Sequence, residues 1–499
     1  MEYISTRDQS ENPRRYSAAQ AICTGLAPDG GLFVPDHIPV MTADEFRALI
    51  PLSYPERAAE ILSRYLTDYG KEELHDFCRR AYAPDRFPGG AAPTTKLGDG
   101  SYMLELWHGP TCAFKDMALQ LMPYLLGAAL RKTGETRTAL ILVATSGDTG
   151  KAALEGFADA EGIKIQVYYP ENGVSAMQKA QMATQSGKNV SVVAIRGNFD
   201  DAQTGVKRLF SDAELKKELD RAGVFFSSAN SINLGRLAPQ IAYYVSAYCD
   251  LCACGALCYG DPLDVTVPTG NFGNILAAFY AKRMGLPLGR LVCASNENCV
   301  LTDFLQNGTY SRLRPFYTTS SPSMDILISS NLERLLFALS DAKTTAGYMK
   351  TLNETGSYTV SPALFRAITD VFSGLCANES QGADCIRETF ERTGCLIDTH
   401  TAVALSCADR YRAEHADQCM LTVSTASPYK FAHDVLSALD GEPHEAGFAA
   451  VDALCEKTGA PIPAPLNSLR SKAFRFTDVT DPDSMIEHVR AFAAQKSMK

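Results

Sequence analysis

The sequence contains no uninterrupted run of about 18 apolar residues, which is the length that a membrane-spanning helix requires. The nearest candidate, residues 241–259, is interrupted by Ser246 and Asp250. Basic residues are too few for a nucleic-acid surface, because 47 lysines and arginines stand against 57 acidic residues and the net charge is −10. The first 15 residues carry charges of both signs and lack the apolar centre of a signal peptide. We therefore expect a cytoplasmic protein with no membrane or nucleic-acid partner.

Fifteen cysteines raise the question of a metal site or disulfides. Cys249, Cys252, Cys254 and Cys258 have a spacing that could supply soft ligands to zinc or to an iron–sulfur cluster. The same segment reads as the end of a helix with alanine, tyrosine and leucine beside the thiols, where cysteine packs as a small apolar residue. We favour reduced thiols and no metal, as is typical of an intracellular enzyme. The role of this cluster stays open.

The chain of 499 residues is too long for one hydrophobic core, and its length suggests roughly two to four domains. From about residue 138, short β-rich runs alternate with helical stretches. Such alternation predicts βαβ units and buried parallel sheets, with ligands at the carboxyl ends of the strands. The expected strands are residues 138–145, 163–169, 190–195, 224–227, 263–267, 291–294 and 420–423.

Residues 108–116, His-Gly-Pro-Thr-Cys-Ala-Phe-Lys-Asp, carry the clearest chemical signal. Lys115 stands between a Gly-Pro turn and an expected helix start, beside an aromatic ring. A lysine amine desolvated in such a place can form a Schiff base with an aldehyde. Taken alone, Lys115 is more simply a solvated charge in the first turn of a helix. The functional interpretation therefore depends on the rest of the chain.

Four loops follow expected strands and open expected helices. The glycine-rich loop Gly270, Asn271, Phe272, Gly273, Asn274 can direct backbone N–H groups at a phosphate. The loop at 145–151 looks like the end of a P-loop but lacks its first glycine and its final Ser or Thr, which makes Mg-nucleotide binding improbable. It offers hydroxyl and N–H groups to an anion through Thr145, Ser146, Asp148, Thr149 and Lys151.

The third loop contains Ser231, Asn233 and Arg236, and an arginine can hold a phosphate through two hydrogen bonds. The fourth, residues 424–431, offers Thr425 as a neutral hydroxyl for a ring nitrogen. Each of the four loops alone could be an ordinary helix cap or turn. Together with Lys115 they match a cofactor that bears an aldehyde, a phosphate and a pyridine ring. That cofactor is pyridoxal 5′-phosphate.

The sequence resembles threonine synthase, a pyridoxal-phosphate enzyme family of the tryptophan-synthase-β fold type (fold type II). The resemblance covers nearly the whole chain and rests on the motifs YISTR at 3–7, GLAPDGGLFVP at 25–35, HGPTCAFKD at 108–116, ATSGDTG at 144–150, NSINLGR at 230–236, PTGNFGN at 268–274 and STASPYKF at 424–431. It implies that Lys115 is the Schiff-base residue and that Asp148 faces the phenolic oxygen of the cofactor. It further implies that Gly270–Asn274 hold the cofactor phosphate, that Thr425 meets the pyridine nitrogen, and that Ser231, Asn233 and Arg236 contact the substrate phosphate.

The sequence departs from the family pattern in the last loop. Ser427 stands where the family usually has a histidine before the proline, and Tyr429 stands where a small residue is more common. Lys151 is an extra cation that could reach the substrate phosphate. Thr145, Ser146 and Thr149 are expected in the substrate site.

The resemblance implies conversion of O-phospho-L-homoserine and water to L-threonine and phosphate, by a monomer or homodimer. It also implies an α/β fold with two parallel-sheet domains and an added N-terminal domain. The expected division is an N-terminal domain at 1–95, a smaller cofactor domain at 96–240, a larger one at 241–450 and a C-terminal extension at 451–499. Alternatives are another fold type II lyase such as serine/threonine dehydratase, or a non-catalytic relative that binds a phosphorylated metabolite.

Overall fold

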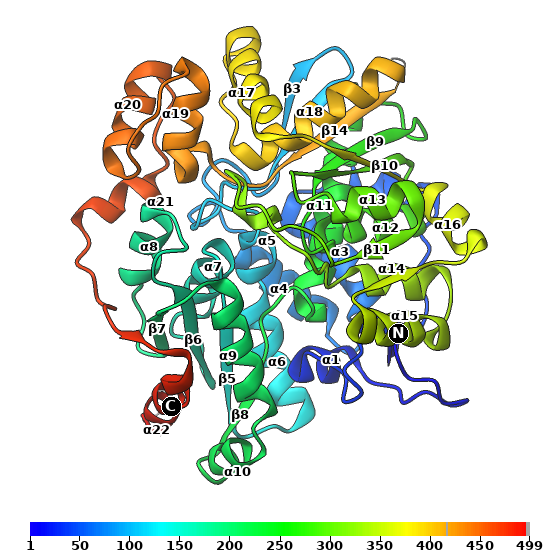
Figure 1. Cartoon of the computed structure of the whole chain (residues 1–499). Helices are drawn as coiled ribbons and strands as arrows, with labels where there is room; N and C mark the ends of the chain where they lie inside the picture. Colours follow the sequence, from blue (N-terminus) through cyan, green and yellow to red (C-terminus); the bar gives the residue numbers. More distant parts are fainter. Residues whose placement is uncertain (416–417, 496–499) are drawn as a thin grey trace.

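The computed structural model describes residues 1–415 and 418–495 and contains two parallel-rich sheets (Figure 1). The larger sheet has six strands in the order β13 (Phe372–Cys376), β10 (Leu288–Ser295), β9 (Leu263–Pro268), β14 (Cys419–Ser424), β4 (Ser101–Glu105) and β3 (Thr94–Gly98). The smaller has five, in the order β15 (Val479–Thr480), β7 (Val190–Ile195), β6 (Ile163–Pro170), β5 (Thr138–Ala144) and β8 (Val224–Ser227). All neighbouring strands are parallel except β3, which runs antiparallel to β4.

Helices cover both faces of the smaller sheet, which explains its almost unbroken apolar strands. Along β5, Leu140 and Leu142 belong to one apolar cluster, whereas Ile141 and Val143 belong to another. This alternation follows from the two-residue period of a strand. The helices of this region are α5 (Asp116–Leu119), α6 (Met122–Thr133), α7 (Asp148–Phe157), α8 (Ala176–Ala183), α9 (Phe199–Ser211) and α10 (Ala213–Arg221).

A long buried helix, α11 (Leu234–Ala253), links the two sheets along the chain and contacts helices from both halves. On the larger sheet, α18 (Thr399–Glu414) packs on β9, β10 and β14. Residues 300–393 form further short elements around that sheet. These are α13 (Val300–Asn307), β11 (Thr309–Ser311), η1 (Pro322–Met324), α14 (Leu332–Leu339), α15 (Ala342–Thr355), β12 (Ser357–Thr359), α16 (Pro362–Thr369) and α17 (Glu379–Thr393), beside α12 (Gly273–Arg283), which follows β9.

The N-terminal region contains four helices and two short strands, none of which the sequence analysis predicted. In α4, Leu74, Phe77, Cys78 and Ala81 are buried at helical spacing, so the amphipathic signal was present in the sequence. The region contains β1 (Tyr3–Ser5), α1 (Ala18–Thr24), β2 (Phe33–Pro35), α2 (Ala43–Leu49), α3 (Tyr54–Tyr65) and α4 (Lys71–Ala81). It packs on the large central cluster of apolar side chains, mainly through contacts of α3 with α11 and of α1 with α6.

The C-terminal segment returns to the smaller sheet, and Figure 1 shows it in red running beside β7 to the end of the chain. There β15 pairs with β7, and Lys164 of β6 donates to the carbonyl oxygens of Phe492 and Ala493, both at 3.0 Å. The elements after β14 are η2 (Pro428–Phe431), α19 (Ala432–Asp440), α20 (Phe448–Thr458), α21 (Ala464–Asn467), η3 (Ser468–Ser471), η4 (Pro482–Ser484) and α22 (Met485–Ala494).

All seven expected strands are present, at 138–144, 163–170, 190–195, 224–227, 263–268, 288–295 and 419–424. The division into domains at residues 95, 240 and 450 stays a prediction. Strands β3 and β4, close to the first boundary, belong to the larger sheet, and β15 belongs to the smaller one. Within the described residues, no helix has both the length and the apolar character needed to cross a bilayer.

Gly156, near the end of α7, allows that helix to lie against the end of α5. A Cβ atom at this position would lie 2.1 Å from the carbonyl oxygen of Leu119. We expect Gly156→Ala to lower the free energy of unfolding by about 2–3 kcal/mol, because backbone cannot move aside as a flexible side chain would. The matched control is Gly347→Ala in α15, where a Cβ meets nothing within 4 Å. That change should stabilise by about 0.5–1 kcal/mol through helix propensity. Equal urea midpoints for the two variants would contradict this packing.

Candidate active site

The segment that carries Lys115 lies directly against the loop that follows β14. Ala113 and Ala426 form an antiparallel bridge, and Phe114 N–H donates to the carbonyl oxygen of Thr425 at 2.8 Å. Ser427 N–H donates to the carbonyl oxygen of Cys112 at 3.0 Å. Because β4 and β14 are adjacent and parallel, the segments after their carboxyl ends meet at one edge of the sheet. The sequence analysis did not predict β4, although its Lys115 loop follows that strand.

Lys115 immediately precedes α5, as the sequence predicted, and is not a solvated charge, since only 10% of its side chain is exposed. Its Nζ atom lies 3.3 Å from Ser323 Oγ, 3.5 Å from Asp148 Oδ2 and 4.9 Å from the centre of the Phe114 ring. Burial lowers the pKa of the Lys115 amine; Asp148 opposes this shift. A lysine with a lowered pKa is a better nucleophile and base near neutral pH.

Asp148, at the start of α7, is shared between two buried lysines. Lys430 Nζ lies 2.7 Å from Asp148 Oδ1, and the Lys430 side chain is fully buried. Lys430 also donates to the carbonyl oxygen of Thr111 at 3.0 Å, and Gln178 donates to Asp148 Oδ1 at 2.9 Å. Burial alone would raise the pKa of Asp148, but Lys430 and Lys115 outweigh it and hold the pKa below its usual value. Lys430 was not recognised as a site residue from the sequence, although it stands in the quoted STASPYKF motif.

A second buried carboxyl group fixes the turn before Lys115. Asp116 accepts hydrogen bonds from the backbone N–H and the hydroxyl of Thr111, both at 2.8 Å. Burial raises the pKa of Asp116 to about 6, against the lowering effect of these hydrogen bonds. A Cβ at Gly109 would lie 2.6 Å from Asp116 Oδ2, so the turn requires glycine there. Asp116 therefore holds the turn that delivers Lys115.

The glycine-rich loop connects β9 to α12 and is shaped by its own backbone. Phe272 is buried with a φ of 60°, and Cys112 in the Lys115 segment has a φ of 57°. Non-glycine residues rarely adopt this left-handed conformation, which costs free energy and is common near functional sites. Asn271 accepts from Ser330, and Gly270 accepts from Ser329 at 2.8 Å.

Asn274 lies one residue inside α12, behind the glycine-rich loop. Its Oδ1 accepts hydrogen bonds from the hydroxyls of Tyr243, at 2.6 Å, and Tyr244. Its Nδ2 atom is buried without a partner among the described residues. Gly273 opens α12, so the first turn of this helix provides the free backbone N–H groups predicted to hold a phosphate.

Arg236, in the first turn of α11, is a buried cation without a carboxylate partner among the residues that the structure describes. Its Nη1 donates to the carbonyl oxygen of Ala229 at 2.7 Å, while Nε has no partner. Burial lowers the pKa of Arg236 to about 10. Arg334 provides a contrast, since that buried guanidinium is bonded to Phe33, Asn331 and Ile232. Arg236 is therefore available to an anion, whereas Arg334 is structural.

Of the other two predicted residues in the Arg236 loop, one has a structural role and the other remains a candidate for the substrate site. Asn233 caps α11 by accepting from Gly235 at 2.8 Å, and its Nδ2 donates to the carbonyl oxygens of Ile22 and Ser228. Both N–H groups of its amide are occupied, so we do not carry Asn233 into the proposed substrate site. Ser231 is half-buried and lies 3.4 Å from the Ser330 hydroxyl, which in turn donates to Asn271. Ser231 thus belongs beside the glycine-rich loop.

Thr145 and Lys151 are bound internally. Thr145 Oγ1 accepts from the N–H groups of Gly147 and Gly150, so it shapes the turn before α7. Lys151 Nζ pairs with Glu155 at 2.8 Å and with Gln185, which leaves it less available than Arg236. Its contact with a substrate phosphate stays a prediction. Ser146 and Thr149 are half-buried at the start of the same turn and can still offer their hydroxyls.

Thr425 is buried at the end of β14, and no hydrogen bond engages its hydroxyl within the described part of the chain. The neighbouring Ser427 hydroxyl is also buried without a partner there. Tyr429 donates its hydroxyl to the carbonyl oxygen of Ala460 and so ties the loop to the C-terminal segment. The two departures from the family pattern thus leave Thr425 free to meet a ring nitrogen, which remains a prediction.

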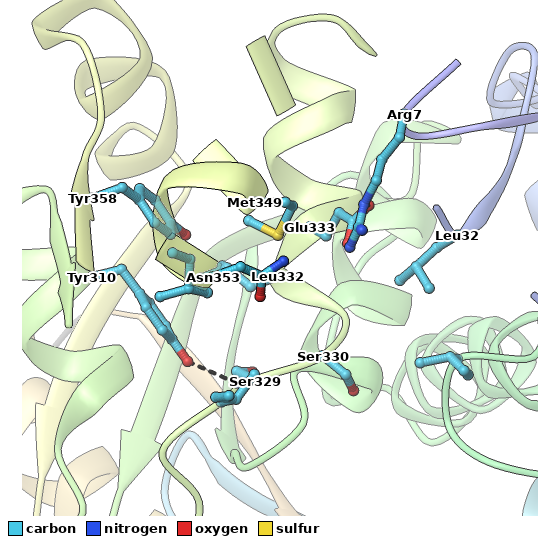
Figure 2. A pocket seen from close by; sticks show the side chains of 13 residues that line it. Arg7, Leu32, Tyr310, Ser329, Ser330, Leu332, Glu333, Met349, Asn353 and Tyr358 are labelled. Carbon is cyan, nitrogen blue, oxygen red and sulfur yellow. Dashed lines mark hydrogen bonds and ion pairs between the residues drawn. The ribbon is translucent and has the colours of Figure 1, made fainter. Parts of the chain in front are cut away.

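A cavity of about 220 Å³ lies near this site but contains none of its predicted residues. Figure 2 shows its aromatic wall of Tyr310 and Tyr358, with Arg7 paired to Glu333 at another side. Ser329 and Ser330 also line it, and these serines bond Gly270 and Asn271. Because the charged pair neutralises itself, the cavity lacks the excess charge found around Lys115.

The residues around Lys115 fit a phosphorylated aldehyde. Lys430 is paired with Asp148, whereas Arg236 is a buried cation with no carboxylate partner among the described residues. An excess of buried positive charge is costly unless an anion balances it. A Cβ at Gly270 would lie 2.7 Å from the Ser323 carbonyl oxygen, so the glycine-rich loop requires glycine at this position.

No group of metal-ligating side chains occurs among the described residues. Cys249 is buried, Cys252 is half-buried, and Cys254 and Cys258 are exposed. All fifteen cysteines are free thiols.

We expect Lys430→Met to destabilise the cofactor-free protein by about 3 kcal/mol, because it removes the nearer cation from a buried carboxylate. The double variant Lys430→Met/Asp148→Asn should recover much of this loss, since it leaves no ionised carboxylate there. Lys188→Met, at an exposed lysine, is the control and should change little. Urea unfolding measures all four proteins. A double variant less stable than Lys430→Met would refute the charge argument.

Three family models match consecutive parts of the chain. "Threonine synthase N terminus" matches residues 2–82, "Pyridoxal-phosphate dependent enzyme" matches 92–425, and "Threonine synthase, C-terminal" matches 401–492. A threonine synthase-like 1 protein of Homo sapiens is 39% identical over 88% of this chain. The chain spans 60% of that relative's length.

A threonine synthase of Pseudomonas aeruginosa is 36% identical over 89% of this chain and 91% of its own. The crystal structure of pyridoxal-phosphate-bound threonine synthase from Brucella melitensis superposes with a TM-score of 0.86 at 35% identity, covering 99% of both chains. The predicted fold class and cofactor are thereby confirmed. The chain therefore belongs to the threonine synthase family of pyridoxal-phosphate-dependent enzymes.

Proposed function

We propose that this protein converts O-phospho-L-homoserine and water to L-threonine and phosphate. The observation that carries the proposal is Arg236, a buried guanidinium with unused donors whose charge acts on Lys115. A substrate that brings its own phosphate would supply the missing anion. Two proteins named threonine synthase, which match this chain over most of their own length, support the same activity.

Four parts of the site would hold the cofactor by its different edges. Gly270–Asn274 would bind its phosphate at the start of α12, and Asp148 would face its phenolic oxygen. Thr425 would meet the ring nitrogen with a hydroxyl, which is too weak an acid to leave that nitrogen fully protonated. Lys115 would attach to the aldehyde. When bound, pyridoxal phosphate supplies the electron sink for charge that develops on the substrate carbon atoms.

Lys115 would act as the base once the substrate amine has displaced it. Its lowered pKa favours the neutral amine, which would take a proton from Cα of the substrate, release that proton, and only then take a second one from Cβ. Positioned bases of this kind contribute about 10²–10⁴ in rate. Asp148, held ionised by Lys430, stabilises the lysine as it gains the proton.

Arg236 and Ser231 would hold the phosphate as the bond to Cγ breaks and water then adds at Cβ. The bidentate geometry of a guanidinium suits a phosphate that is accumulating charge. Ser146 and Thr149 would receive the substrate carboxylate at the start of α7. We further propose a cytoplasmic enzyme, monomeric or homodimeric, with the four-part division expected from the sequence.

The reaction is tested by incubating purified holoenzyme with O-phospho-L-homoserine and measuring phosphate and L-threonine. The two products should appear in equal amounts, whereas ammonia release from L-serine or L-threonine should be far slower. Lys115→Ala should lose the visible absorbance of the bound cofactor and at least 10²-fold in turnover, on the order of a missing base. Faster ammonia release would favour a dehydratase, and absence of any turnover with normal absorbance would favour a binding protein.

The role of Arg236 is tested separately with Arg236→Met. Losing charge-assisted hydrogen bonds should reduce kcat/KM for O-phospho-L-homoserine by about 10–100-fold. Arg221→Met, at an exposed arginine of α10, should leave it unchanged. Added inorganic phosphate should inhibit the native enzyme and inhibit Arg236→Met more weakly. Equal inhibition of both proteins would place the phosphate elsewhere.

A further inference from the structure

The turn η1 places Ser323 against Lys115, although the sequence analysis did not identify Ser323 as a site residue. Lys115 Nζ donates to Ser323 Oγ at 3.3 Å. The carbonyl oxygen of Ser323 also packs on Gly270, where a Cβ would lie 2.7 Å away. The same short turn therefore contacts both the lysine and the glycine-rich loop.

Ser323 is fixed from behind by His400 and Asp398. The N–H of Ser323 donates to His400 Nε2 at 3.1 Å, while His400 Nδ1 lies 2.8 Å from Asp398 Oδ2. With Nε2 an acceptor, the bonding assigns the proton to Nδ1, which donates to Asp398. Asp398 caps α18 by accepting from the N–H groups of His400 and Thr401, so the dyad stands on the buried end of a long helix.

Serine, histidine and aspartate together suggest a hydrolytic triad, but the geometry excludes that interpretation. In such a triad the histidine takes the proton of the serine hydroxyl. Here His400 Nε2 is occupied by the backbone N–H of Ser323, and the hydroxyl faces Lys115. The dyad therefore acts on the position of Ser323 and not on its reactivity.

The hydrogen-bond capacity of a neutral amine explains how the two acceptors beside Lys115 could orient it. Such an amine has two N–H donors and one lone pair. Lys115 Nζ has two acceptors beside it, Ser323 Oγ at 3.3 Å and Asp148 Oδ2 at 3.5 Å. Donation to both leaves the lone pair pointing in a third direction. Without one of them the amine can rotate about its terminal bond, and the fraction of time in a productive orientation falls.

We propose that Ser323 is a positioning residue that orients the Lys115 amine, and that His400 and Asp398 hold it in place. The inference rests on the proposed role of Lys115 as the base. Charged groups that act on Lys115 are Asp148 of α7, Lys430 of η2 and Arg236 of α11, and none of these is changed by substitution of Ser323. Any change in the behaviour of Lys115 when Ser323 is substituted can therefore be attributed to the Ser323 hydroxyl.

The first measurement uses cofactor-free protein. The rate at which it couples added pyridoxal phosphate is followed by visible absorbance across a range of pH, which gives the apparent pKa of Lys115. Removal of an acceptor disfavours the charged amine, so Ser323→Ala should lower this pKa by roughly one unit. Ser323→Thr keeps the hydroxyl and should behave as the native protein.

The second measurement uses holoenzyme and O-phospho-L-homoserine. Ser323→Ala should lower kcat by about 10–100-fold, part of the contribution of a positioned base, while KM changes little. A lowered pKa for coupling together with slower turnover is a combination that a merely loosened fold would not produce. His400→Ala should show a weaker form of it, because the Ser323 turn loses its support. Ser320→Ala is the control, since the Ser320 side chain makes no hydrogen bond within the described residues.

Unchanged coupling and unchanged kcat in Ser323→Ala would overturn the proposal. A loss in Ser323→Ala that Ser323→Thr fails to restore would also overturn it, because the hydroxyl would then not be the cause. If the native protein does not act on O-phospho-L-homoserine, the proposed function fails. The coupling measurement still decides whether Ser323 acts on Lys115.

Discussion

The site depends on one carboxylate, Asp148, placed between two buried lysines. Its two oxygens are divided, with Oδ1 taken by Lys430 and Oδ2 facing Lys115. Burying any one of these charges alone would cost free energy through lost hydration, and pairing them offsets that cost. The pairing keeps Asp148 ionised, while burial keeps the Lys115 amine easy to deprotonate. Two opposite electrostatic requirements are thus met within a few ångströms.

The fold makes this arrangement possible by collecting distant segments at the carboxyl ends of two sheets. Lys115 follows β4, Lys430 follows β14, and the glycine-rich loop follows β9, three adjacent strands of the larger sheet. Asp148 follows β5 of the smaller sheet, so the ion pairs cross between the two sheets. Arg236 stands at the start of α11, which touches helices of both halves. The ion pairs of Asp148 with Lys115 and Lys430 therefore depend on how the two sheets are placed relative to each other.

Much of this could be predicted from the sequence where local pattern and chemistry coincide. Strand–turn–helix junctions with glycine and hydroxyl residues located the loops, and Lys115 was recognised from its motif. Asn233 shows the limit, since a polar residue at a helix start can be a cap or a ligand, and only the bonding distinguishes them. β3 and β4 were missed because their mixed polar and apolar residues do not show the long apolar runs of the other strands.

Lys430 and Ser323 could not be predicted for a different reason. Lys430 is bound to Asp148, 282 positions earlier in the chain, and Ser323 touches a lysine 208 positions away. No local spacing encodes such contacts, and both residues look like ordinary polar residues of their loops. The N-terminal helices are the opposite case. Their 3.6-residue pattern is present, as the buried face of α4 shows, but polar and proline-rich surroundings obscured it.

The C-terminal segment returns to the smaller sheet, which has a consequence for the order in which the strands of that sheet can pair. Ala194 of β7 pairs with Val479 of β15, so this edge of the sheet lacks its native neighbour until a residue 285 positions later has been made. Until then β7 presents unpaired N–H and carbonyl groups, the kind of edge at which chains associate wrongly. Helix α22 then packs over Lys164, whose ammonium donates hydrogen bonds to three backbone carbonyl oxygens at the end of this helix. The strand that completes the smaller sheet is therefore made long after the four strands that it joins.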